Sequence, residues 1–107
     1  MTEMTAKEIK GEIKWTARNI ASAKRDLLKA EMKIETLKKL NRLEAENRDF
    51  LLSKDALNYL EKEISRRIAE NYDNIDEELE NIDFLKKQIA KNNAFIAELE
   101  IALTQVA

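Results

Sequence analysis

Residues 68–103 decide the fold, and they read IAENYDN IDEELEN IDFLKKQ IAKNNAF IAELEIA L when they are divided into groups of seven. Each group begins with isoleucine, and the series ends in leucine: Ile68, Ile75, Ile82, Ile89, Ile96 and Leu103. An apolar residue at every seventh position keeps one side of an α-helix facing a partner helix, and it makes the two helices supercoil left-handed. The stretch therefore predicts a long helix of a coiled coil.

The composition of the whole chain agrees with a coiled coil. Of the 107 residues, 44% are hydrophobic and 37% are charged, with one glycine and no proline. This balance is typical of long helices, and the length corresponds to a single helical domain, 1–107. A net charge of −2 and periodic hydrophobic residues argue against a disordered chain. We expect one all-α domain.

A second heptad pattern lies in the N-terminal half. Four aliphatic residues recur there at every seventh position: Ile13, Ile20, Leu27 and Ile34. The repeat continues through Asn41 and Arg48, but it resumes six residues later, at Lys54. This slip predicts two helical arms, about 5–51 and about 55–106, that are joined by a turn at about 52–54.

Two residues near the slip favour the start of a helix. Ser53 is a preferred N-cap, and Asp55 would lie in the first helical turn, where a negative charge suits the helix dipole. Since neither glycine nor proline marks the turn, its place is defined only to within several residues.

The two arms are expected to form an antiparallel two-helix coiled-coil hairpin. Folding the chain about Leu52 and Ser53 brings the seam positions of one arm opposite those of the other: Ile20–Leu85, Ala23–Ile82, Ala30–Ile75, Ile34–Asn71 and Leu37–Ile68. Small residues opposite isoleucine favour interdigitated packing. A polar seam residue such as Asn71 can fix the alignment of two helices at a cost in stability.

The charges of the two arms are opposite. Residues 1–54 contain 13 Lys or Arg and 9 Asp or Glu, a net charge of +4, and residues 55–107 contain 6 and 12, a net charge of −6. The acidic residues within 76–83 are therefore expected to face Lys24, Arg25 and Lys29. Such exposed pairs contribute about 0–1 kcal/mol each, so they select a partner more than they stabilise it.

A three-helix bundle is the alternative architecture. It requires a break in the second arm at Asn71–Asn74, with Asp73 or Asn74 as the N-cap of a third helix. The heptad pattern passes through this stretch without a shift, which favours the hairpin.

Several kinds of chemistry are excluded by residues that the sequence lacks. Histidine and cysteine are absent, so the usual general bases, nucleophile pairs and soft metal ligands are missing. Gly11 is the single glycine, which excludes a glycine-rich phosphate loop. The acidic stretch that begins at Asp73 does not fit a calcium-binding EF-hand, because Glu78 and Phe84 stand where Gly and Glu are needed. We expect no enzyme activity, no cofactor and no metal site.

The sequence also bears on where the protein works. The longest apolar run, residues 94–97, is far too short to span a membrane, and the N-terminus carries no hydrophobic signal region. We therefore expect a cytoplasmic protein that does not enter the membrane. The abundance of Lys, Asn, Ile and Glu suggests an AT-rich genome, such as that of a low-GC bacterium or its phage. We therefore include a phage-related, viral protein among the expectations.

Four of the large hydrophobic residues outside the predicted seam are predicted to form an interface: Trp15, Phe84, Phe95 and Ile101. None of them is needed to close a seam between two helices, so another helix is expected to cover them. Two hairpins that dimerise into a helical bundle would cover them, and so would a different protein. The sequence thus predicts a protein-binding module that acts as an oligomeric structural, adaptor or inhibitory coiled-coil protein.

A nucleic-acid-associated helical protein is the alternative function. Basic residues follow one face of the first arm, with the spacing that could track phosphates: Lys7, Lys10, Lys14 and Arg18. Glu8 and Glu12 interleave with these basic residues along the sequence, and the isoelectric point of about 5.3 is acidic. These two observations favour protein binding over nucleic-acid binding.

Overall fold

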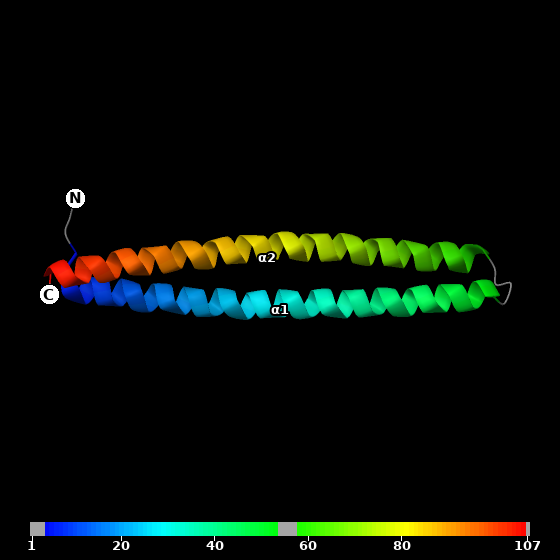
Figure 1. The fold of residues 1–107 in the computed structure, drawn as a ribbon, viewed down its shortest axis with the longest axis horizontal. Coiled ribbons are helices and arrows are strands. Elements are labelled where there is room, and N and C mark those ends of the chain that lie inside the picture. Colours follow the sequence, from blue (N-terminus) through cyan, green and yellow to red (C-terminus); the bar gives the residue numbers. More distant parts are fainter. Residues whose placement is uncertain (1–3, 54–57, 107) are drawn as a thin grey trace. The chain divides into compact units, whose positions relative to one another are not determined.

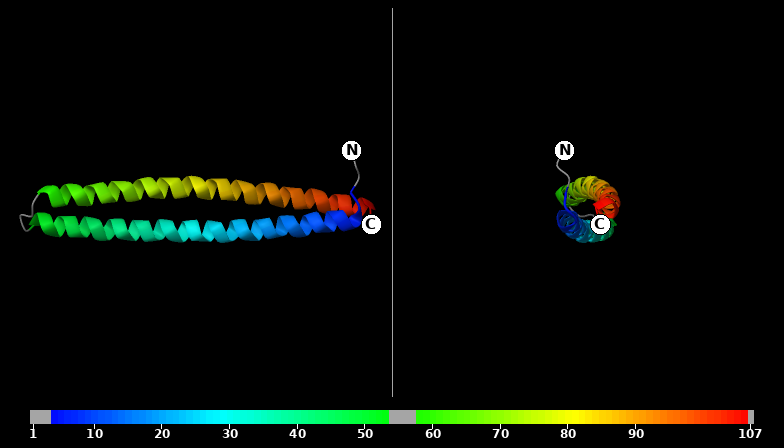
Figure 2. Two further views of the ribbon diagram at one scale, coloured as in Figure 1. Left: turned by 180° about the vertical axis from the view of Figure 1, so that it is seen from behind. Right: turned by 90° about the vertical axis from the view of Figure 1, so that its left-hand side faces the viewer.

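The computed structural model describes residues 4–53 and 58–106, which form two long helices. Helix α1 spans Ala6–Ser53 and helix α2 spans Asn58–Val106. They pack side by side and run in opposite directions (Figures 1 and 2). The predicted all-α hairpin is confirmed. Helix α2 continues through Asn71–Asn74, so the break that a three-helix bundle requires is not found there.

Helix α1 begins with a reciprocal hydrogen-bonded cap. The Glu8 backbone N–H donates to the Thr5 hydroxyl at 3.2 Å, and the Thr5 backbone N–H donates to the Glu8 carboxylate at 3.4 Å. This capping box satisfies two backbone donors that a helix start leaves unpaired. The absence of proline then allows α1 to continue for 48 residues.

Two of the residues in the predicted turn at about 52–54 belong to the first helix. Leu52 and Ser53 both belong to α1, and the Ser53 hydroxyl donates to the Phe50 carbonyl of its own helix at 2.6 Å. Ser53 therefore does not cap the following helix. Lys54 and Asp55 lie outside the described residues, and α2 begins at Asn58. No glycine or proline marks the connection, so the sequence located it only approximately.

The contacts within the hairpin divide it into two units, each of which contains parts of both helices. Unit 1 comprises residues 1–28 and 83–107, and unit 2 comprises residues 29–82. In unit 1, the buried side chains are Ile9, Thr16, Ile20, Ala23, Leu85 and Leu99. In unit 2, they are Ala30, Ile34, Asn41, Ile64 and Ile75. Each of these residues lies either on one of the two seven-residue repeats or three residues after a position of its repeat. These are the two seam positions of a heptad, so the heptad assignment is confirmed.

The alignment of the helices in unit 2 differs from the predicted one by a full heptad. The Asn71 side-chain amide donates to the Asn41 side-chain carbonyl at 2.8 Å, whereas Asn71 was predicted to face Ile34. Two ion pairs agree with the observed alignment: Lys33–Glu78 at 3.0 Å and Arg67–Glu44 at 3.1 Å. A shift of seven residues returns every seam residue to the seam, so the hydrophobic pattern cannot detect it.

The predicted partners of the acidic stretch are corrected by the same observation. Glu78 pairs with Lys33 and not with Lys29, and Asp83 pairs with Lys87 of its own helix at 2.8 Å. The Lys33–Glu78 pair therefore lies further along α1 than was expected, in the same direction as the shift of the asparagine pair. Neither helix contains, within its described residues, a stretch long and apolar enough to cross a membrane.

Candidate interaction surfaces

The four hydrophobic residues that were predicted to bind a partner are all exposed in unit 1. Trp15 lies on α1 with 60% of its surface exposed, and Phe84, Phe95 and Ile101 lie on α2 with 58%, 41% and 61% exposed. These fractions are high for large hydrophobic side chains, which are usually buried in a single domain. The seam of unit 1 is closed by other residues, so these four side chains are available to a partner.

Their heptad positions show which of them share a face. Trp15 and Phe84 occupy position c of their helices, and Phe95 occupies position g. In an antiparallel pair the g positions of both helices border the same side of the seam, and each c position lies next to g. Trp15, Phe84 and Phe95 therefore belong to one lateral face of unit 1, the aromatic face. Ile101, at position f, lies at the outer side of α2.

Unit 2 exposes further large hydrophobic side chains. Leu40 and Leu43 are both about half exposed, and they line a shallow hollow together with Glu44, Asn47 and Arg67. The other exposed residues of this kind in unit 2 are Met32, Phe50, Leu52, Tyr72 and Leu79. They were not included in the predicted interface, although each lies off the seam by the same heptad count. Their heptad positions alone identify them as residues outside the seam.

The four basic residues of the alternative interface are also exposed, on α1 of unit 1. They occupy the adjacent heptad positions b, e and f, so they share the basic face: Lys7, Lys10, Lys14 and Arg18. Positions e and b border the side of the seam opposite to g and c. The aromatic and basic faces of unit 1 therefore lie on different sides of the seam. None of the four basic side chains has an ion-pair partner among the described residues.

Three acidic side chains of α2 form ion pairs with basic residues of the same helix: Glu63, Glu70 and Asp83. Arg66 hydrogen-bonds to both Glu63 and Glu70, and its hydrogen bond is the main cause that lowers the pKa of Glu63 below the ordinary value. Glu44 of α1 binds across the seam, and its hydrogen bond raises the pKa of Arg67. Over the described part of the chain, no three carboxylates gather closely enough to hold a metal ion.

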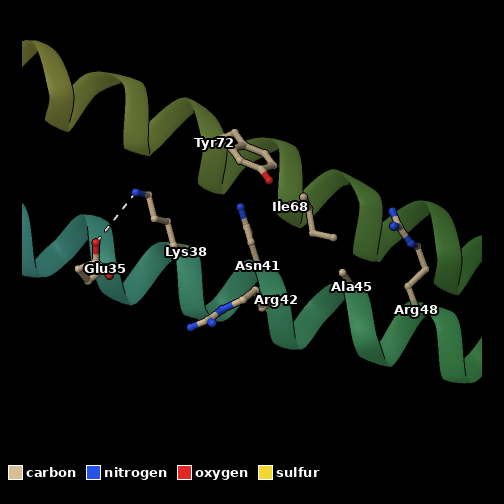
Figure 3. A pocket seen from close by; sticks show the side chains of 8 residues that line it. All are labelled: Glu35, Lys38, Asn41, Arg42, Ala45, Arg48, Ile68 and Tyr72. Carbon is tan, nitrogen blue, oxygen red and sulfur yellow. Dashed lines mark ion pairs between the residues drawn. The ribbon is translucent and has the colours of Figure 1, made fainter.

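A groove on unit 2 was not anticipated from the sequence. Eight residues from both helices line it: Glu35, Lys38, Asn41, Arg42, Ala45, Arg48, Ile68 and Tyr72 (Figure 3). Asn41 is only 6% exposed, and its side-chain nitrogen has no hydrogen-bond partner in the structure. The groove brings together residues whose proximity depends on the alignment of α1 with α2. For this reason, the heptad pattern of either helix alone could not reveal it.

Comparison of the chain with protein-family models, with curated proteins and with solved structures gives no match. Its function must therefore be inferred from the exposed surfaces of the two units.

Proposed function

We propose that the chain is a non-enzymatic protein-binding module whose main interface is formed by the aromatic face and Ile101. The observation that carries this proposal is the exposure of Trp15 and Phe84, each more than half accessible although the seam is already closed. Tryptophan and phenylalanine are enriched at the centres of protein interfaces, where truncating one side chain typically costs about 2 kcal/mol or more. The interface thus needs no chemistry beyond hydrophobic burial.

A second copy of the chain is the partner that we favour. Residues 1–54 carry a net charge of +4 and residues 55–107 carry −6, so α1 of one hairpin can lie beside α2 of another without like-charge repulsion. Two hairpins would then share one hydrophobic core, as in four-helix bundles. Such an oligomer would act as a structural, adaptor or inhibitory coiled-coil protein. A cytoplasmic location and a phage-related origin are part of the same proposal, and they are supported by the sequence alone.

Nucleic-acid binding through the basic face is the second candidate. It is favoured by one observation: Lys7, Lys10, Lys14 and Arg18 are exposed on a common face and lack ion-pair partners among the described residues. Binding to phosphates releases counterions, so the affinity would fall steeply as the salt concentration rises. Burial of the aromatic face would respond to salt much less.

A pair of double variants separates the two functions. Trp15→Ala with Phe95→Ala is expected to reduce the oligomer mass, measured by light scattering, and to weaken self-association at least tenfold at both low and high salt. Lys10→Glu with Lys14→Glu is expected to leave the oligomer mass unchanged. Circular dichroism serves as the control, since all four residues are exposed and neither variant should lose helix content.

The opposite result would overturn the proposal. If the aromatic variant stays fully assembled while the charge-reversed variant loses the ability to retain a DNA or RNA duplex at low salt, the basic face carries the function. A wild-type chain that is monomeric at all concentrations, and that retains neither nucleic acid nor another protein, would contradict both candidates.

A further inference from the structure

We propose that the groove of unit 2 binds a small oxyanion, such as a phosphate or carboxylate group, at the buried amide of Asn41. This site lies entirely in unit 2 and contains none of the residues assigned to the protein interface, so it does not depend on the proposed function. Figure 3 shows its lining, with six residues from α1 and two from α2.

An unpaired donor marks the place where the anion would bind. The Asn41 side-chain carbonyl accepts a hydrogen bond from Asn71 at 2.8 Å, but the Asn41 side-chain nitrogen is buried without a partner. A buried donor without an acceptor destabilises a protein by about 1–3 kcal/mol, and nearly all such groups in proteins are paired. In Figure 3 this nitrogen points from α1 toward α2 and Tyr72. An acceptor that entered beside Tyr72 would satisfy it.

The charged residues that line the groove favour an anion over a cation or a neutral ligand. Lys38, Arg42 and Arg48 line the groove, and Glu35 is the single carboxylate among its lining residues. Lys and Arg side chains can only donate hydrogen bonds, so they complement a ligand that can only accept them. Hydrogen bonds between two charged groups are also shorter and stronger than neutral ones.

The guanidinium groups are only weakly engaged within the protein. Arg48 is half-buried, and its one hydrogen bond among the described residues is to the Ser65 hydroxyl, at 3.4 Å. Arg42 has no ion pair in the described chain, and the Lys38–Glu35 pair is exposed, with its charged atoms 4.0 Å apart. Neither Arg42 nor Arg48 therefore has a carboxylate partner among the described residues, and both can accept an anion as a partner.

Space for the anion exists because Ala45 has a small side chain. Ala45 lies one helical turn beyond Asn41 and one turn before Arg48, so it leaves the surface between these two residues hollow. On the other side, Tyr72 of α2 directs its hydroxyl group toward the Asn41 amide (Figure 3). Tyr72 is 58% exposed, which lets its ring move when a ligand enters. Its hydroxyl would supply a second donor to the same oxygen.

The site can be tested by titrating the complete chain, labelled with nitrogen-15, with sodium phosphate and separately with sodium acetate at constant ionic strength. The Asn41 side-chain amide signal is expected to shift and to saturate with at least one of the two anions. Saturation with phosphate alone identifies a phosphoryl ligand, and saturation with acetate as well identifies a carboxylate. Both results support an oxyanion site.

Three variants make the test specific. Ala45→Leu fills the groove without changing the charge, and Arg48→Gln removes one guanidinium; each is expected to weaken binding about tenfold or more. Lys14→Gln removes one charge from the basic face of unit 1 and is expected to leave binding unchanged. The proposal is overturned if the Asn41 amide does not shift, if its shift never saturates, or if Lys14→Gln weakens binding as much as Arg48→Gln. The comparison of Lys14→Gln with Arg48→Gln tests the proposed site even if Ala45→Leu perturbs the fold.

Discussion

Replacing Ile75 with aspartate is expected to lower the free energy of unfolding by about 3 kcal/mol or more. Ile75 is 6% exposed and belongs to the ladder of isoleucines along α2. The aspartate would lose its hydration in the seam without gaining a partner, and an unpaired buried charge is among the most destabilising single changes. Thermal unfolding followed by circular dichroism, at one fixed protein concentration, measures the loss.

Ile101→Asp is the matched control for this prediction. It makes the same chemical change on the same helix, but Ile101 is 61% exposed and lies off the seam. We expect its effect on unfolding to be within about 0.5 kcal/mol for the isolated chain. If both variants lose the same stability in the absence of oligomers, the seam has been assigned to the wrong residues.

Replacing the asparagine pair with leucine is expected to raise the free energy of unfolding. In the double variant Asn41→Leu with Asn71→Leu, the unpaired amide disappears and two apolar side chains fill the same layer. Because both hydrogen-bonding partners are removed together, no polar group is left stranded, and a gain of about 1–3 kcal/mol is expected. The measurement is the midpoint of urea unfolding, compared with that of the parent chain.

The same double variant is expected to be less specific in how its two helices align. A polar residue at one seam position penalises alignments that leave it opposite an apolar residue, so it favours a single pairing of helices. Without the asparagine pair, alignments that differ by a heptad become closer in energy, and chains are expected to associate into a mixture of sizes in light scattering. A double variant that is less stable than the parent would show that the pair stabilises the fold outright.

The buried seam could be predicted from the sequence because burial in a coiled coil depends on spacing alone. Ile9, Ile34, Ile64 and Leu99 are buried for the same reason: each recurs in a heptad frame that turns it toward the partner helix. The exposure of Trp15 and Phe84 followed from the same frame, since position c points away from the seam. Nothing about the partner helix was needed for these predictions.

The pairing of the helices could not be predicted in this way. Moving one helix by seven residues exchanges Ile34 for Asn41 opposite Asn71, and the hydrophobic pattern is unchanged. One hydrogen bond and the ion pairs of Glu44 and Glu78 favour the observed alignment over the shifted one. The groove depends on this pairing too, because Tyr72 reaches the neighbourhood of Asn41 only when Asn41 lies opposite Asn71.

The most direct test of the account is a disulfide between the two asparagine positions. The chain contains no cysteine, so Asn41→Cys with Asn71→Cys introduces a single pair of thiols. Because the hydrogen bond places the two side chains opposite one another in one layer of the seam, oxidation is expected to link the cysteines within one chain, as seen by mass spectrometry of the unreduced protein.

The pair Ile34→Cys with Asn71→Cys tests the alignment that the sequence predicted. Its thiols are offset by one heptad, about 10 Å along the helix, which is beyond the reach of a disulfide. The account predicts rapid linkage within the chain for the pair at 41 and 71, and almost none for the pair at 34 and 71. Linkage only between chains, or preferential linkage of the pair at 34 and 71, would contradict the hairpin as described.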